Sequence, residues 1–338
     1  MTTKTAFQYS HSIGFLSNRN KGFQHPVDIA MDSQGLLYVL NRVGPEVSVR
    51  IPYKRLTLCT VDAEYLGEIS TGGMGDGQLW WPSSLAFDSE DKLYVADEAL
   101  NRVSIFSKEG DFLGQWGVQG SGQGQLDRPS GIAFDAEDNL LVTDSLNHRV
   151  QKFSRDGTFV STWGELGDGP GRFNMPWGVT VDRAGDVYVA DWRNDRIQKL
   201  DPTGKFIAQW GSSGEGEGQF NRPAGIAVDE DGNMYVADWG NERVQVMNQQ
   251  GEVLDILRGD SVDSTWAEDY FLANPEEGAA RRAADLEPVV DPPEEKLRET
   301  SANVEKLFWG PTSVKLDGQG RVYIVDSCRH RLQIYRKG

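Results

Sequence analysis

The segments "LLVTDSLNHRVQKF" (140–153), "VYVADWRNDRIQKL" (187–200) and "MYVADWGNERVQVM" (234–247) are three versions of one unit. Each has an aspartate as its fifth residue and an arginine five residues later. The aspartates Asp144, Asp191 and Asp238 follow one another at intervals of 47 residues. Self-similarity at a fixed period indicates a repeat architecture, in which one small folding unit recurs along the chain.

Three further copies raise the number of units to six. "LYVADEALNRVSIF" (93–106) lies one period earlier, "VYIVDSCRHRLQIY" (322–335) lies near the end, and "LYVLNRV" (37–43) begins the series with Asn41 in place of the aspartate. The repeated Asp and Arg answer a need that every unit shares, so we expect them to hold the turn between them in register.

Each unit is predicted to contain four short strands, called a to d here. Strand a follows a proline, as in "PAGIAVD" (223–229), strand b ends at the repeated aspartate, strand c starts at the arginine, and strand d resembles "FIAQWG" (206–211). Short apolar stretches bounded by Gly, Asp, Asn and Pro are the signal of strands and hairpins. The repeat therefore predicts an all-β fold, a six-bladed β-propeller, as a single domain over residues 1–338.

The last unit lacks its strand d, because the chain stops after "RLQIYRKG" (331–338). "YSHSIG" (9–14) precedes Pro26 at the same distance as "FVSTWG" (159–164) precedes Pro176. We therefore expect the N-terminal strand to complete the sixth blade and close the ring, which removes the open sheet edges.

The segments "GQFNRPAGIAVD" (218–229) and "YVADWGNERVQV" (235–246) resemble the NHL-repeat family. The resemblance covers about residues 20–259 and 307–338, and it implies a six-bladed propeller. It implies no single activity, because NHL propellers include RNA-binding modules, protein-interaction platforms and the peptidylglycine amidating lyases.

Two of those activities fit this sequence poorly. The amidating lyases hold their metal with histidines, one of them directly after the repeat proline. Here that position is occupied by Val27, Ser83, Ser130, Trp177, Ala224 and Thr312, so we expect no metal and no cofactor. The formal net charge of −17 disfavours nucleic acid as a partner. No segment has the length and apolarity of a membrane span, and the chain has two cysteines, so a cytoplasmic protein without a membrane partner is expected.

Both departures from the period fall on one face of the expected ring. Nine extra residues lie between Asn41 and Arg55, in the loop between strands b and c, and an insert of about residues 260–306 lies between blades 5 and 6. The b–c and d–a loops emerge on the same face, called the top face here. "NPEEGAARRAADLEP" (274–288) starts with a helix cap and a proline, so the insert is predicted to form two or three short helices on the top face, as a lid or as a solvated decoration.

Aromatic and basic side chains also gather in the top-face loops. Six of the ten tryptophans and two arginines map there as ligand-binding candidates: Trp80, Trp81, Trp177, Trp192, Trp239, Trp309, Arg128 and Arg222. They are expected either to line a cup for a ligand or to cover the outer ends of the core. Three other tryptophans, Trp116, Trp163 and Trp210, end strand d and are expected to pack between blades.

Asp28 and Lys315 differ from the residues that the other blades have at the same positions, and His25 is close to Asp28 in the sequence. Asp28 and Lys315 belong to neighbouring blades and are expected to face each other, as a structural ion pair or as an acid/base pair, with His25 nearby. His148 and His330, in b–c loops, are expected at the surface. The sequence thus favours binding of a small molecule or peptide in the top cup, with a protein partner as a further option. The alternative is a metal-independent hydrolase or lyase that uses Asp28, His25 and Lys315 beneath the insert.

Overall fold

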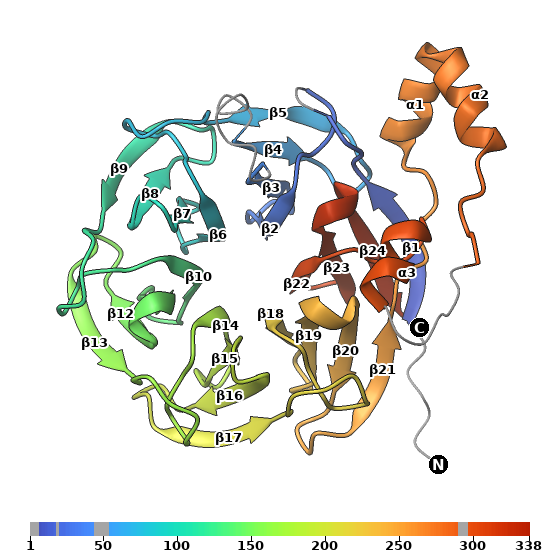
Figure 1. The fold of residues 1–338 in the computed structure, drawn as a ribbon. Helices are drawn as coiled ribbons and strands as arrows, with labels where there is room; N and C mark the ends of the chain where they lie inside the picture. Colours follow the sequence, from blue (N-terminus) through green and yellow to red (C-terminus); the bar gives the residue numbers. More distant parts are fainter. Residues whose placement is uncertain (1–6, 18–19, 44–53, 290–296) are drawn as a thin grey trace.

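The computed structural model is a six-bladed β-propeller whose blades surround a central channel (Figure 1). It describes residues 7–17, 20–43, 54–289 and 297–338. Each blade is one four-stranded antiparallel sheet. Blades 1 to 3 contain β2 (Pro26–Met31), β3 (Leu37–Asn41), β4 (Arg55–Cys59) and β5 (Tyr65–Ile69); β6 (Pro82–Phe87), β7 (Leu93–Asp97), β8 (Arg102–Phe106) and β9 (Phe112–Trp116); and β10 (Pro129–Phe134), β11 (Leu140–Asp144), β12 (Arg149–Phe153) and β13 (Phe159–Trp163). Blades 4 to 6 contain β14 (Pro176–Val181), β15 (Val187–Asp191), β16 (Arg196–Leu200) and β17 (Phe206–Trp210); β18 (Pro223–Val228), β19 (Met234–Asp238), β20 (Arg243–Met247) and β21 (Val253–Leu257); and β22 (Pro311–Leu316), β23 (Arg321–Asp326), β24 (Arg331–Lys337) and β1 (Phe7–Ile13).

The ring closes between the two ends of the chain, as predicted. β1 is antiparallel to β24, with Gln8 opposite Arg336 and Ile13 opposite Leu332. Blade 6 therefore takes three strands from the C-terminal end and its outer strand from the N-terminal end. This pairing leaves no blade without its fourth strand.

The core lies mainly between neighbouring blades. Strand b is buried along its length in blades 1 to 5 and from its second residue in blade 6, whereas strand d consists mostly of exposed and half-buried residues. A Cβ atom added to Gly204, in the c–d turn of blade 4, would lie only 2.1 Å from the ring of Trp163 in blade 3. Trp116 and Trp210 contact Gly157 and Gly251 of the next blade in the same way. The predicted interblade position of these three tryptophans is confirmed.

The repeated Asp and Arg tie two top-face loops together. In blade 5, Asp238 accepts hydrogen bonds from the backbone N–H of Asn221 (2.7 Å) and from Nε of Arg243 (2.8 Å). Arg243 also donates to the carbonyl oxygens of Gly216 and Gln219 in the d–a loop. The pair therefore fixes the d–a loop against the b–c turn, a wider role than the turn alone.

A second repeated contact joins each blade to the next, and we call it the interblade latch. The residue before the repeated arginine has a left-handed backbone, and its side chain accepts the N–H of the residue before the next blade's first proline. The acceptor and donor pairs are Asn101–Arg128 (2.8 Å), His148–Met175 (3.0 Å), Asp195–Arg222 (2.7 Å), Glu242–Gly310 and His330–His25 (2.9 Å). The two histidines are therefore partly exposed residues that also serve as joints between blades.

The latch is reversed between blades 1 and 2. Lys54 occupies the acceptor position, and its ammonium donates to the carbonyl oxygen of Trp80. The N–H of Trp81 is instead bonded to Asp97 (3.0 Å). A lysine has three donors and no acceptor, so the identity of this one residue explains the exception. The nine extra residues of blade 1 fall mostly at 44–53, outside the described residues.

The insert forms three helices, but most of it does not lie where the sequence predicts. α1 (Thr265–Ala273) and α2 (Pro275–Ala283) lie outside the ring, next to β1 (Figure 1). α3 (Leu297–Asn303) contacts the top-face turns of blades 5 and 6, and the carbonyl oxygens of its Ser301 and Ala302 accept hydrogen bonds from Arg329 (both 2.9 Å). Trp266 of α1 is 2% exposed and packs between blades 6 and 1. The burial of Trp266 in the core between blades 6 and 1 therefore holds the first two helices outside the ring, away from the channel.

Candidate functional site

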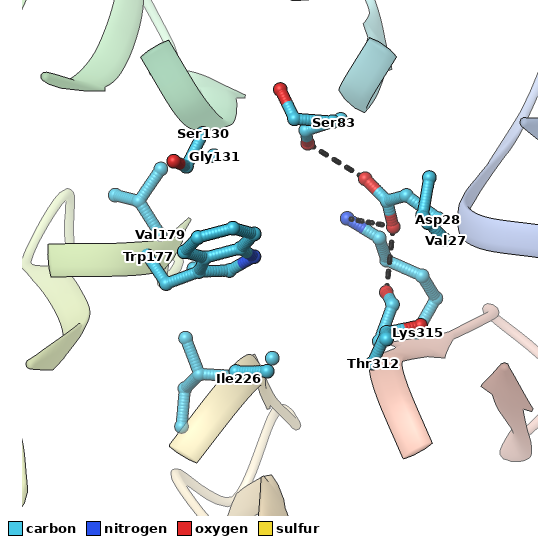
Figure 2. A pocket seen from close by; sticks show the side chains of 15 residues that line it. Val27, Asp28, Ser83, Ser130, Gly131, Trp177, Val179, Ile226, Thr312 and Lys315 are labelled. Atoms are coloured by element: carbon cyan, nitrogen blue, oxygen red, sulfur yellow. Dashed lines mark hydrogen bonds and ion pairs between the residues drawn. The ribbon is translucent and has the colours of Figure 1, made fainter. Parts of the chain in front are cut away.

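The mouth of the central channel is nearly filled. The inner strands leave a cavity of about 30 Å³ between Val27, Ser83, Ser130, Trp177, Thr312 and Lys315. The indole of Trp177 lies across it, facing Asp28 and Lys315 (Figure 2). A site for a small molecule usually has at least about 300 Å³, whereas this space suits one or two water molecules. The channel itself is therefore not the predicted cup.

Asp28 and Lys315 face each other, as the sequence predicts, with Nζ 3.4 Å from Oδ1 (Figure 2). Asp28 is 4% exposed, and its carboxylate also accepts hydrogen bonds from the hydroxyls of Ser313 (2.6 Å) and Ser84 (2.7 Å). The N–H of Leu85 adds a fourth contact at 3.2 Å. These partners belong to blades 6 and 2, so the aspartate of blade 1 ties three inner strands together. The arrangement is that of a structural ion pair.

His25 belongs to a different contact. Its backbone N–H is bonded to Nδ1 of His330, and the two rings lie with their centroids 4.6 Å apart. Burial, helped by the charges of His25 and Arg329, lowers the pKa of His330 to about 3. His25 does not line the cavity at the channel mouth. The three residues of the alternative catalytic hypothesis therefore do not lie together around one cavity.

The predicted aromatic residues form three separate clusters on the top face. In the first, at blades 1 to 3, Arg42 lies 4.7 Å from the ring centroid of Trp81 and Lys54 lies 4.7 Å from that of Trp80. Arg42 also pairs with the buried Glu98 at 3.0 Å. Burial lowers the pKa of Arg42 and of Lys54 and raises the pKa of Glu98. Here the tryptophans are covered by cations of the same chain.

The second cluster, at blades 5 and 6, is covered in part by the insert. Arg298 of α3 lies 4.4 Å from the ring centroid of Trp239 and pairs with Glu242 at 2.9 Å. Arg329 lies 5.5 Å from the ring centroid of Trp309. Burial raises the pKa of Glu242 to about 7.

The third cluster lies at blades 4 and 5, and we call it the blade 4–5 patch. The rings of Trp177 and Trp192 are in contact, with centroids 5.9 Å apart. Arg222 lies 5.0 Å and Arg193 lies 5.6 Å from the ring centroid of Trp192. Both arginines are exposed, and neither forms an ion pair within the described part of the chain. Arg128 is also exposed but belongs to the neighbouring blade 3.

Arg193 was not among the predicted ligand-binding residues. Its signal is present in the sequence, because "DWR" (191–193) places a cation directly after the loop tryptophan. The other blade with this tryptophan has "DWG" (238–240). Because a cation at this position occurs in only one blade, the repeated fold does not require it. It therefore indicates a function specific to the top face of blade 4.

The described residues offer no resident metal site. No group of three or more His, Cys, Asp or Glu side chains is placed to hold an ion within 7–17, 20–43, 54–289 and 297–338. Among the helices of the same ranges, none has the length and apolarity needed to cross a membrane.

The NHL repeat family matches residues 126–153, 173–200, 220–247 and 308–335, which are strands a to c of blades 3 to 6 with the end of the loop before them. The chain is an NHL-repeat propeller. In this NHL propeller the matched blades are those with the Asp–Arg pair, whereas blade 1 has Asn41 and blade 2 has an arginine that bonds the d–a loop alone. No curated protein matches the sequence.

Solved structures similar to the NHL propeller are other propellers of low identity. A protein of unknown function from Bacteroides thetaiotaomicron is 19% identical over 98% of this chain and 76% of its own, with a TM-score of 0.63. A catalytically inactive virginiamycin B lyase from Staphylococcus aureus is 13% identical over 98% and 99%, with a TM-score of 0.57. A chain of the nidogen/laminin complex is 18% identical over 69% and 79%, with a TM-score of 0.51. At these identities the likeness shows the fold alone.

Proposed function

We propose that this NHL propeller is a binding protein whose blade 4–5 patch takes an acidic peptide segment of a partner. The observation that carries the proposal is the pair of exposed arginines, Arg193 and Arg222, whose guanidinium groups both lie close to the ring of Trp192. The chain as a whole is strongly acidic. Two unpaired guanidinium groups therefore stand out as a site for carboxylates, which arginine binds by forked hydrogen bonds.

The shape of the top face favours a peptide over a small molecule at this place. The channel beside the patch holds only about 30 Å³, so a ligand must lie across the loops. Trp192 and Trp177 offer apolar area of low conformational entropy for such a segment. Their loops are fixed by the Asp–Arg pair of blade 4, in which Arg196 donates to Asp191 at 2.9 Å. Little ordering entropy then opposes binding.

The test is selection of peptides from a random displayed library on the immobilised protein. We expect enrichment of sequences rich in Asp and Glu, with affinity that falls as salt is raised. The double variant Arg193→Gln and Arg222→Gln should bind the enriched peptides at least tenfold more weakly, because each charge-assisted hydrogen bond contributes roughly 1.5–3 kcal/mol.

The matched control is Arg183→Gln, an arginine 77% exposed in the a–b turn of blade 4, on the opposite face. It should leave binding unchanged. Enrichment of peptides without acidic residues, or equal binding by the double variant, would contradict the proposal.

A further inference from the structure

A groove of about 630 Å³ separates the insert from blade 6. This volume lies within the range of about 300–1,000 Å³ that small-molecule sites occupy. One wall comes from α1, α2 and the segment around Val262, and the other comes from the end of β1 and the b–c turn of blade 6. The groove lies outside the blade 4–5 patch, and the proposed function makes no use of it.

Part of the groove is apolar and uncovered. Phe15 and Tyr270 line it with their rings in contact, centroids 5.4 Å apart, and Phe271 follows on α1. Leu16 and Val262 line it and are 56% and 67% exposed. Apolar side chains gathered in one concave place mark a binding site more often than single exposed ones do.

The polar part of the groove has donors left over after its acceptors are paired. The carboxylate of Asp263 is bonded to Arg281 (2.6 Å), that of Glu305 to Arg329 (2.6 Å), and that of Glu277 to the hydroxyl of Tyr270 (2.8 Å).

Among the donors, Nε of Arg329 is buried and has no partner within the described residues. His330 accepts the N–H of His25 at Nδ1, so its proton is on Nε2, a second donor. A ligand that brings an acceptor would therefore complete this group.

We propose that the groove binds a small carboxylic acid with an apolar body, such as an aryl or medium-chain acyl carboxylate. The apolar body lies against Phe271, Tyr270 and Leu16. The carboxylate accepts hydrogen bonds from the side of the groove that carries Arg281, Arg329 and His330. Three carboxylates and three guanidinium groups line the groove, so a single added anion meets no net negative charge there.

The experiment is a fluorescence titration with 1-anilinonaphthalene-8-sulfonate, followed by displacement with decanoate and 2-naphthoate. We expect one saturable site per chain and displacement by both acids, with decanol displacing at least tenfold less well. Phe271→Ala should weaken binding of the probe at least fivefold, because the phenyl ring supplies apolar contact area to the bound probe. Leu272→Ala is the matched control, since this neighbour on α1 is 78% exposed and does not line the groove.

Leu16→Gln changes the opposite wall of the groove, which belongs to the ring and not to the insert. This variant therefore tests the site even when Phe271→Ala unfolds the insert. It should weaken the probe as well. Arg222→Gln should leave the titration unchanged, which separates this site from the peptide site. The proposal would be overturned by an absence of saturable binding. It would also be overturned if Leu16→Gln and Phe271→Ala both bound the probe as tightly as the wild type, or if decanol displaced the probe as well as decanoate does.

Discussion

Acid should weaken the joint between blades 6 and 1, because one latch acceptor there is a histidine. His330 accepts the N–H of His25 through Nδ1, and a protonated imidazole has no acceptor. Its pKa is lowered to about 3 by burial in the folded protein, from a usual value of 6.5. A group whose pKa is lowered on folding contributes stability that is complete above its unfolded pKa and is lost as the pH falls toward its folded pKa.

The size of the effect follows from these two pKa values. Between pH 7 and pH 5 the unfolded chain takes up about 0.7 of a proton at this histidine, while the folded protein takes up almost none. Linkage then predicts a loss of about 2 kcal/mol in the free energy of unfolding over this interval.

A variant suggested by the chain itself isolates the histidine. Asn101 occupies the same position in blade 2 and accepts the same kind of hydrogen bond at 2.8 Å, so His330→Asn should keep the latch without the titration. Denaturant unfolding followed by tryptophan fluorescence at pH 7 and pH 5 gives the free energy of both proteins. The wild type should lose about 2 kcal/mol more than His330→Asn, since every other titrating group is shared. Equal losses in the two proteins would refute the reasoning.

Four other substitutions test the joints and the closure. Burial raises the pKa of Glu242 to about 7 from 4.5, so its ionisation lowers the free energy of unfolding as the pH rises from about 4.5 to 7. Glu242→Gln should therefore add up to about 3 kcal/mol to the free energy of unfolding at pH 8 and little at pH 4, measured by denaturant unfolding. Gly320→Ala places a Cβ in open space on a left-handed backbone and should cost about 1 kcal/mol in thermal melts. Gly204→Ala drives a Cβ into Trp163 and should cost about 2–3 kcal/mol more, so equal melting temperatures would contradict the interblade packing. Trp266→Ala should cost roughly 3–5 kcal/mol and speed amide exchange in β1 if α1 holds the closure.

The sequence predicts the ring well because the ring is the repeated part. Each blade has its proline before strand a and its strand b, and most blades follow one another at a period of 47 residues. A misplaced strand in one blade is therefore evident from comparison with the other five. The closing strand is predictable for the same reason, since Pro26 fixes the place of "YSHSIG" (9–14).

The top face could not be predicted to the same depth. The cations that lie over the loop tryptophans mostly come from other parts of the chain, which the local sequence does not show. Arg298 is 59 positions from Trp239 and Arg222 is 30 positions from Trp192, whereas Arg193 is next to Trp192. The insert occurs once, so no second copy shows where it packs. Its position depends on the indole of Trp266, which donates to the carbonyl oxygen of Ala63 in blade 1.

The reversed latch sets a limit on how this molecule could be enlarged or shuffled. Blades 2 to 5 all end in an acceptor and, from blade 3 onward, all begin with a left-handed N–H donor. A duplicated copy of blade 3 or blade 4 would therefore meet its neighbours with matching donors and acceptors. A duplicated blade 1 would bring the ammonium of Lys54 against an N–H of the following blade. Blades 1 and 2 are thus the two units whose order along the chain is fixed by hydrogen-bond polarity, because blade 1 must be followed by a blade that, like blade 2, offers a carbonyl oxygen.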